Sequence, residues 1–140
     1  MASREYQPRK LFTLEEASRT LPLVSRVVRD IVETSQSIFD ARREAARLTQ
    51  SGDTQGASHK RAQVDRFVID VQEYLEELDT IGCLIKDYQR GLIDFPSRHE
   101  GRTVFLCWEL GEPDILHWHE LDAGYAGREP IERLFSNSEF

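Results

Sequence analysis

The first 82 residues place apolar side chains at alternating spacings of three and four, which is typical of helices that pack lengthwise on another helix. The first row is Leu14, Ala17, Leu21, Val24, Val28, Ile31, Ser35 and Ile38, closed by Arg42, Ala45 and Leu48. The second row is Val64, Phe67 or Val68, Val71, Leu75, Leu78 and Ile81. The segment SGDTQG between the rows has two glycines and no apolar residue, as suits a turn. The pattern predicts an antiparallel helical hairpin over residues 11–82.

A capping box predicts the start of the first helix. In the segment TLEE, Thr13 and Glu16 can each satisfy a backbone N–H group of the other residue. This helix is expected to run to about Thr49. Pro22 lacks a backbone donor, so we expect it either to kink the helix or to delay its regular part.

The second helix is expected to begin near Ala57, after a turn at residues 51–56, and to end at Gly82. A second apolar stripe also needs cover, and it consists of Val27, Val32, Phe39, Phe67 and Tyr74. A helix pair cannot bury two stripes by itself. We therefore expect the C-terminal half to lie along the hairpin, and a second copy of the chain to pack on it as a homodimer.

The remainder of the chain reads as short strands. Apolar and β-branched runs predict strands at residues 84–86, 92–95, 103–110 and 115–121, and Pro96 is expected to end the second of them. Glu129-Pro130 is expected to start a last helical turn. The predicted fold class is α+β, with a long helical hairpin followed by a small antiparallel β-meander that lays one face on the helices.

These patterns predict a single domain over residues 1–140. Within it, residues 1–10 are expected to form a flexible arm, 11–82 the hairpin, 83–135 the β-module and 136–140 a frayed tail.

Charge and cysteine content limit the function classes. The net charge is -7, which argues against sequence-independent binding to nucleic acid, because such binding rests on Lys and Arg at phosphates. Two cysteines, Cys83 and Cys107, are too few for a disulfide-stapled domain. No apolar run approaches membrane-spanning length, and the N-terminal residues lack the apolar core of a signal peptide. We therefore expect a cytoplasmic protein with no membrane partner.

The motifs FTLEEA, GLIDFP, LCWELGE, WHE and GYAGR occur in this order between residues 12 and 128. In this combination the chain resembles the uncharacterised family called domain of unknown function 2203. The resemblance implies a long helical hairpin followed by a compact segment, and it implies no activity. It points to Asp94, Phe95, Pro96, Cys107, Trp108, Gly111, Glu112, Trp118, His119, Gly124, Gly127 and Arg128. Cys83 and His117 fall outside the pattern.

His117 and His119 share one face of a predicted strand, a spacing that occurs in metal sites on sheets. Further ligands for an ion such as zinc are available in Asp94, Glu109, Glu112 and Cys107. The alternative is that His119 hydrogen-bonds Asp94 or Glu112 within a buried polar network and binds nothing.

Two other interpretations concern the same module. Cys107 and His119 could form a thiolate–imidazole nucleophile pair, whereas Cys107 also suits a buried position in mid-strand. The glycine loop that ends in Arg128 could hold an anion or simply form a turn with an ion pair. Trp108 and Trp118 are expected to be core residues between the sheet and the hairpin.

Two function hypotheses follow. The first is a non-enzymatic interaction or scaffold module whose sheet is held by a buried network of Asp94, Glu112, His119 and Arg128. The second is a divalent-metal-binding protein or a small metal-dependent enzyme that uses the same residues. The sequence names no substrate and no small-molecule ligand.

Overall fold

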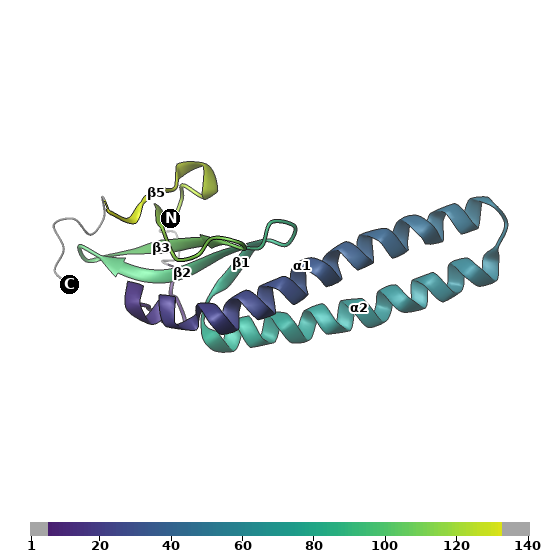
Figure 1. Cartoon of the computed structure of the whole chain (residues 1–140), viewed down its shortest axis with the longest axis horizontal. Coiled ribbons are helices and arrows are strands. Elements are labelled where there is room, and N and C mark those ends of the chain that lie inside the picture. Colours follow the sequence, from purple (N-terminus) through teal and green to yellow (C-terminus); the bar gives the residue numbers. More distant parts are fainter. Residues whose placement is uncertain (1–5, 133–140) are drawn as a thin grey trace, which may run out of the picture.

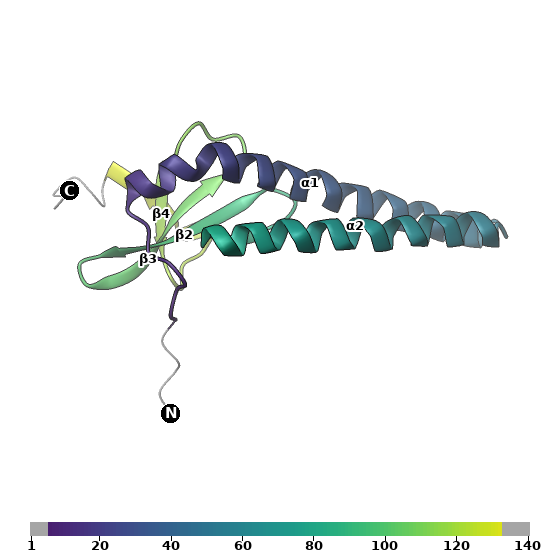
Figure 2. The ribbon, with the colours of Figure 1, turned by 90° about the horizontal axis from the view of Figure 1, so that it is seen from below.

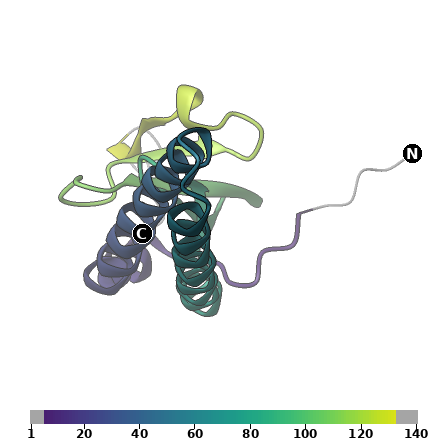
Figure 3. The ribbon, with the colours of Figure 1, turned by 90° about the vertical axis from the view of Figure 1, so that its right-hand side faces the viewer.

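The computed structural model describes residues 6–132 and contains two long helices and a five-stranded antiparallel sheet. The helices are α1 (Leu14–Gln50) and α2 (Thr54–Ile81); the strands are β1 (Leu84–Asp87), β2 (Leu92–His99), β3 (Arg102–Glu109), β4 (His117–Glu120) and β5 (Glu129–Pro130). The strand order is β1-β2-β3-β4-β5. Figures 1 and 3 show the helices on one side of the sheet and the C-terminal segment, including the 3₁₀ turn η1 (Tyr125–Gly127), on the other. The predicted α+β fold is confirmed.

The predicted capping box starts α1. The Glu16 backbone N–H donates to the Thr13 hydroxyl at 3.0 Å, and the Thr13 N–H donates to the Glu16 carboxylate at 2.9 Å. Pro22 lies within a continuous helix, so it does not delay the helix start.

The turn between the helices is shorter than the sequence pattern suggested. It covers residues 51–53, and α2 starts at Thr54 because the Asp53 carboxylate accepts the Gly56 N–H at 2.8 Å. The sequence pattern placed residues 54–56 in the turn because they contain no apolar side chain. An aspartate such as Asp53 is, however, a common N-cap residue. Gly82 ends α2 in the left-handed conformation, as expected.

Two predictions about the strands were wrong. The second strand does not end at Pro96 but continues to His99, with Pro96 opposite Phe105 of β3. The Pro96 carbonyl accepts the Phe12 N–H at 2.7 Å, so the backbone polar groups of Pro96 point away from β3. A proline is tolerated there because the ladder does not need its missing N–H.

The second difference concerns the chain after β4. Glu129-Pro130 forms the short strand β5, and the helical backbone expected there begins only after it, at residues 131–132. It pairs with His117 and Trp118 of β4, and the Ile131 N–H donates to the Leu116 carbonyl at 2.9 Å. This pairing draws the C-terminal segment onto the sheet.

The hydrophobic core lies between the sheet and the base of the hairpin. It includes Val24, Val28, Ile31 and Leu78 from the helices, and Ile93, Phe95, Val104, Leu106, Trp108 and Trp118 from the strands. The distal part of the hairpin extends beyond the sheet (Figures 1 and 2). Within residues 6–132, neither helix contains an apolar stretch suited to crossing a bilayer.

Part of the predicted flexible arm makes defined contacts. The Tyr6 ring lies 5.6 Å from the ring of Phe105, and Arg9 forms an ion pair with Asp79 of α2. Residues 1–5 and the predicted frayed tail, 136–140, lie outside the described residues.

Replacing Gly91 by alanine is expected to lower the free energy of unfolding by about 2 to 5 kcal/mol, measured by urea denaturation. Gly91 has a φ of +70°, and an added Cβ would lie 2.8 Å from Leu110 Cβ and 2.9 Å from Val28 Cγ1. Gly101→Ala is the matched control, because Gly101 has a φ of +77° but no atom within 4 Å of the new Cβ. Equal losses in the two variants would contradict this packing argument.

Candidate functional site

The polar residues singled out in the sequence gather on the outer face of the sheet, away from the helices. Cys107 of β3 lies opposite Asp94 of β2 and opposite His117 of β4. One step along the strands, His119 lies opposite Phe105. Side chains alternate between the two faces along a strand, so one face holds Asp94, Phe105, Cys107, His117 and His119.

Asp94 and His119 form a buried pair at the centre of this face. His119 Nε2 lies 2.9 Å from Asp94 Oδ1, and His119 Nδ1 lies 2.7 Å from the backbone carbonyl oxygen of Glu120. Only 2% of Asp94 and 3% of His119 is exposed to solvent. Both ring nitrogens face an acceptor, which is the arrangement that suits a doubly protonated imidazolium.

The surroundings of His119 act on its pKa in opposite directions. Burial alone lowers this pKa, because it disfavours the charged ring. Hydrogen bonds to Asp94, to Cys107 and to the Glu120 carbonyl outweigh burial, and they raise the pKa of His119 to about 10. His119 is therefore the positively charged member of the pair, an imidazolium, at neutral pH.

Cys107 joins this pair to a second one. Ligand atoms of Asp94, Cys107 and His119 lie within 4.8 Å of one another. On the other side, Arg128 Nη1 lies 3.9 Å from the Cys107 sulfur, and Arg128 Nη2 lies 2.9 Å from Glu112 Oε2. The four residues of the predicted network thus form two ion pairs, with a fully buried thiol between them.

Glu112 fixes the turn after β3. Its Oε1 accepts the backbone N–H of Glu109 at 2.7 Å, and its backbone carbonyl accepts the indole N–H of Trp108 at 3.0 Å. Together with the contact to Arg128, these bonds tie the turn to both the core and the C-terminal segment.

Sequence reasoning missed Arg90 and Tyr125. The Tyr125 hydroxyl donates to Glu109 Oε1 at 3.1 Å, and the guanidinium groups of Arg90 and Arg128 lie 4.0 and 4.6 Å from the Tyr125 ring centre. Arg90 also donates to Glu109 at 3.3 Å. The contact of Arg90 with Glu109 could have been inferred from antiparallel pairing of GLIDFP with LCWELGE. This pairing places Leu92 opposite Glu109 and so brings the residues before Leu92 near it.

The structure separates the six proposed metal ligands. Among the described residues, His119 and Asp94 group with Cys107, whereas His117, Glu109 and Glu112 join no set of three potential ligands. His117 Nδ1 lies 3.5 Å from Glu112 Oε2 without the geometry of a hydrogen bond. Trp108 and Trp118 lie in the core, as expected.

The arrangement gives little support to nucleophilic catalysis. A nucleophilic thiol must be reached by its substrate. Cys107 has 0% exposure to solvent, and its neighbours Asp94 and His119 are 2% and 3% exposed.

Glu112→Ala is expected to lower the free energy of unfolding by about 2 to 3 kcal/mol, because it leaves the Glu109 N–H and the Arg128 guanidinium without their acceptor. Glu112→Gln keeps one acceptor oxygen and is expected to lose less. Glu76→Ala, at an exposed position of α2, serves as the control. Chemical denaturation would contradict the role of Glu112 if all three variants matched the wild type.

Comparison with known proteins identifies the chain at the level of the family. The family described as Uncharacterized conserved protein (DUF2203) matches residues 10–131, which confirms the resemblance inferred from the motifs. No curated protein and no solved structure matches the chain. Because the family match includes both helices and all five strands, the chain belongs to the DUF2203 family.

Proposed function

We propose that this chain is a non-enzymatic interaction module, in which the sheet anchors a helical hairpin that docks on a partner. A second copy of the chain, joined through the hairpins, is the proposed partner. One observation carries the proposal. Asp94 and His119 form a hydrogen-bonded ion pair with each other, and both side chains are almost completely buried.

A closed cluster suits a structural role. Catalytic groups must reach a substrate, whereas Asp94, Cys107 and His119 are 2%, 0% and 3% exposed. Removing one partner of a buried ion pair leaves an uncompensated charge, which costs about 3 to 5 kcal/mol. The cluster therefore contributes to the integrity of the sheet, and the docking role falls to another part of the molecule.

The hairpin offers the surface for docking. Its distal part extends past the sheet (Figure 1), and it carries the large apolar side chain of Phe39, which is 52% exposed. Exposed apolar surface of this kind often marks a protein–protein contact site.

Composition supports two further parts of the proposal. Cys83 and Cys107 are both buried and unbridged, in keeping with a reducing cytoplasm. The net charge of -7 supports a partner other than nucleic acid.

A second candidate function is the binding of a divalent ion such as zinc. It is favoured by the convergence of Asp94, Cys107 and His119, together with the Glu120 carbonyl that orients the His119 ring, as outer-shell groups do in metal sites. An ion would have to displace the contact between Asp94 and His119 and to release the proton on Nε2.

Metal analysis and stability measurements on the same preparations separate the two candidates. We expect no stoichiometric ion in the purified full-length chain, and a loss of about 3 to 5 kcal/mol of unfolding free energy in His119→Ala. His59→Ala, at an exposed position on α2, is the control and is expected to change neither quantity. One equivalent of zinc that disappears in His119→Ala would overturn the structural role and establish the second candidate.

The raised pKa of His119 predicts how stability depends on pH. Because this pKa is about 10 in the folded protein and about 6.5 in an unfolded chain, its contribution is complete below pH 6.5 and is lost as pH rises through 10. The free energy of unfolding should therefore fall across this interval, by up to about 1.4 kcal/mol per pH unit.

The measurement is the difference in unfolding free energy between wild type and His119→Gln, followed by urea denaturation from pH 6 to pH 10. His59→Gln controls for titration of the other groups. A difference that stays constant over the whole interval would show that His119 does not carry the extra proton.

A further inference from the structure

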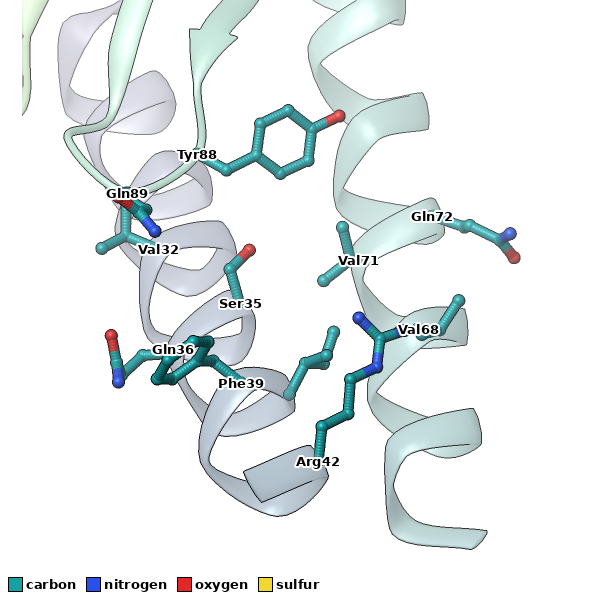
Figure 4. Close-up of a pocket in the computed structure, with 11 residues that line it drawn as sticks. Val32, Ser35, Gln36, Phe39, Arg42, Val68, Val71, Gln72, Tyr88 and Gln89 are labelled. Carbon is teal, nitrogen blue, oxygen red and sulfur yellow. The ribbon is translucent and has the colours of Figure 1, made fainter. Parts of the chain in front are cut away.

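A groove of about 390 Å³ opens between α1 and α2, just beyond the sheet (Figure 4). Its apolar lining comes from both helices, and Tyr88 of the β1–β2 turn stands between the helices at one end. The apolar side chains are Val32, Ile38, Phe39, Val68, Val71 and Tyr88. Arg42 extends from α1 toward α2 at the other end.

The groove is a hollow, and the exposed ring of Phe39 is a projection on the same surface. Phe39 lines the groove but is itself 52% exposed, and Tyr88 is 41% exposed. A surface with both features can pair with a copy of itself about a two-fold axis, because each protomer then supplies one projection and one hollow.

The distribution of charge along the hairpin sets the direction of such a pairing. The distal end carries the exposed basic residues Arg42, Arg43, Arg47, Arg61 and Arg66. From residue 70 onward, α2 carries Asp70, Glu73, Glu76, Glu77 and Asp79, and no basic residue. Two hairpins that run in opposite directions bring the basic end of each toward the acidic half of the other, whereas parallel hairpins would align like charges.

We infer that a second copy of this chain docks on the groove in an antiparallel, two-fold arrangement, with Phe39 of each protomer seated in the groove of the other. This inference rests on the proposed docking role of the hairpin, and it specifies the surface and the orientation. The distal halves of the two hairpins then form a four-helix assembly, and the turn that carries Tyr88 limits how far each tip can advance.

Sedimentation equilibrium of the full-length chain at micromolar concentration tests the surface. We expect a dimer for the wild type and at least about tenfold weaker association for Phe39→Glu, since a buried charge would replace an aromatic anchor. Ile69→Glu is the matched control, because Ile69 is 55% exposed and does not line the groove. Circular dichroism establishes that both variants remain folded.

Spin labels on a cysteine introduced at Ser51 test the orientation. With the two-fold axis near Phe39, the rise of an α-helix places the labels at the two tips about 36 Å apart. A parallel dimer would bring them together. The native thiols are both buried, and burial raises the pKa of Cys83 to about 12, so labelling is selective.

The outcomes distinguish this inference from the function on which it rests. A dimer that persists in Phe39→Glu, or tips that lie together, would overturn the inference and leave the docking role of the hairpin intact. A wild-type chain that remains monomeric would overturn the homodimer altogether. Zinc bound at His119 would overturn the non-enzymatic role without affecting the groove.

Discussion

The Asp94 carboxylate and the His119 ring lie on the outer face of a sheet whose inner face is already covered by the helices. Each charge would cost several kcal/mol if it were buried alone. Their pairing across β3 therefore requires cover from the rest of the chain. Arg128, from the segment that follows β4, lies against the neighbouring Cys107, and Tyr6 packs on the neighbouring Phe105. Segments from both ends of the described chain therefore pack on the face that holds the buried ion pair.

The hairpin could be predicted because its determinants are local. A repeat of apolar positions sets the helix faces, and Thr13 with Glu16 sets a helix start within four residues. The β-meander could also be predicted, because each strand pairs with its neighbour in the sequence. The errors arose where a distant partner decides the outcome. Pro96 stays in a strand because Phe12 approaches its free side, and Glu129-Pro130 becomes a strand because β4 offers an edge.

The candidate site was predictable in its members but not in its connections. Asp94, Cys107, Glu112, His119 and Arg128 were all singled out by motif and residue type. The strand register decides that His119 meets Asp94 and that Arg128 meets Glu112. That register depends on the geometry of the turns between the strands, which composition does not reveal. Arg90 and Tyr125 were missed for the same reason, because their roles exist only once the two loops meet.

The contact of Phe12 with β2 has a consequence for how this chain acquires its structure. The Ser97 hydroxyl donates to the Phe12 carbonyl across 85 residues of sequence, while the helix pairing and strand pairings join neighbours along the chain. Local pairings close short loops and form quickly, whereas closing a long loop carries a larger entropy cost. Each half is thus built from pairings between neighbouring segments, whereas the core between sheet and helices, and the contact of Phe12 with β2, close the long loops of this chain.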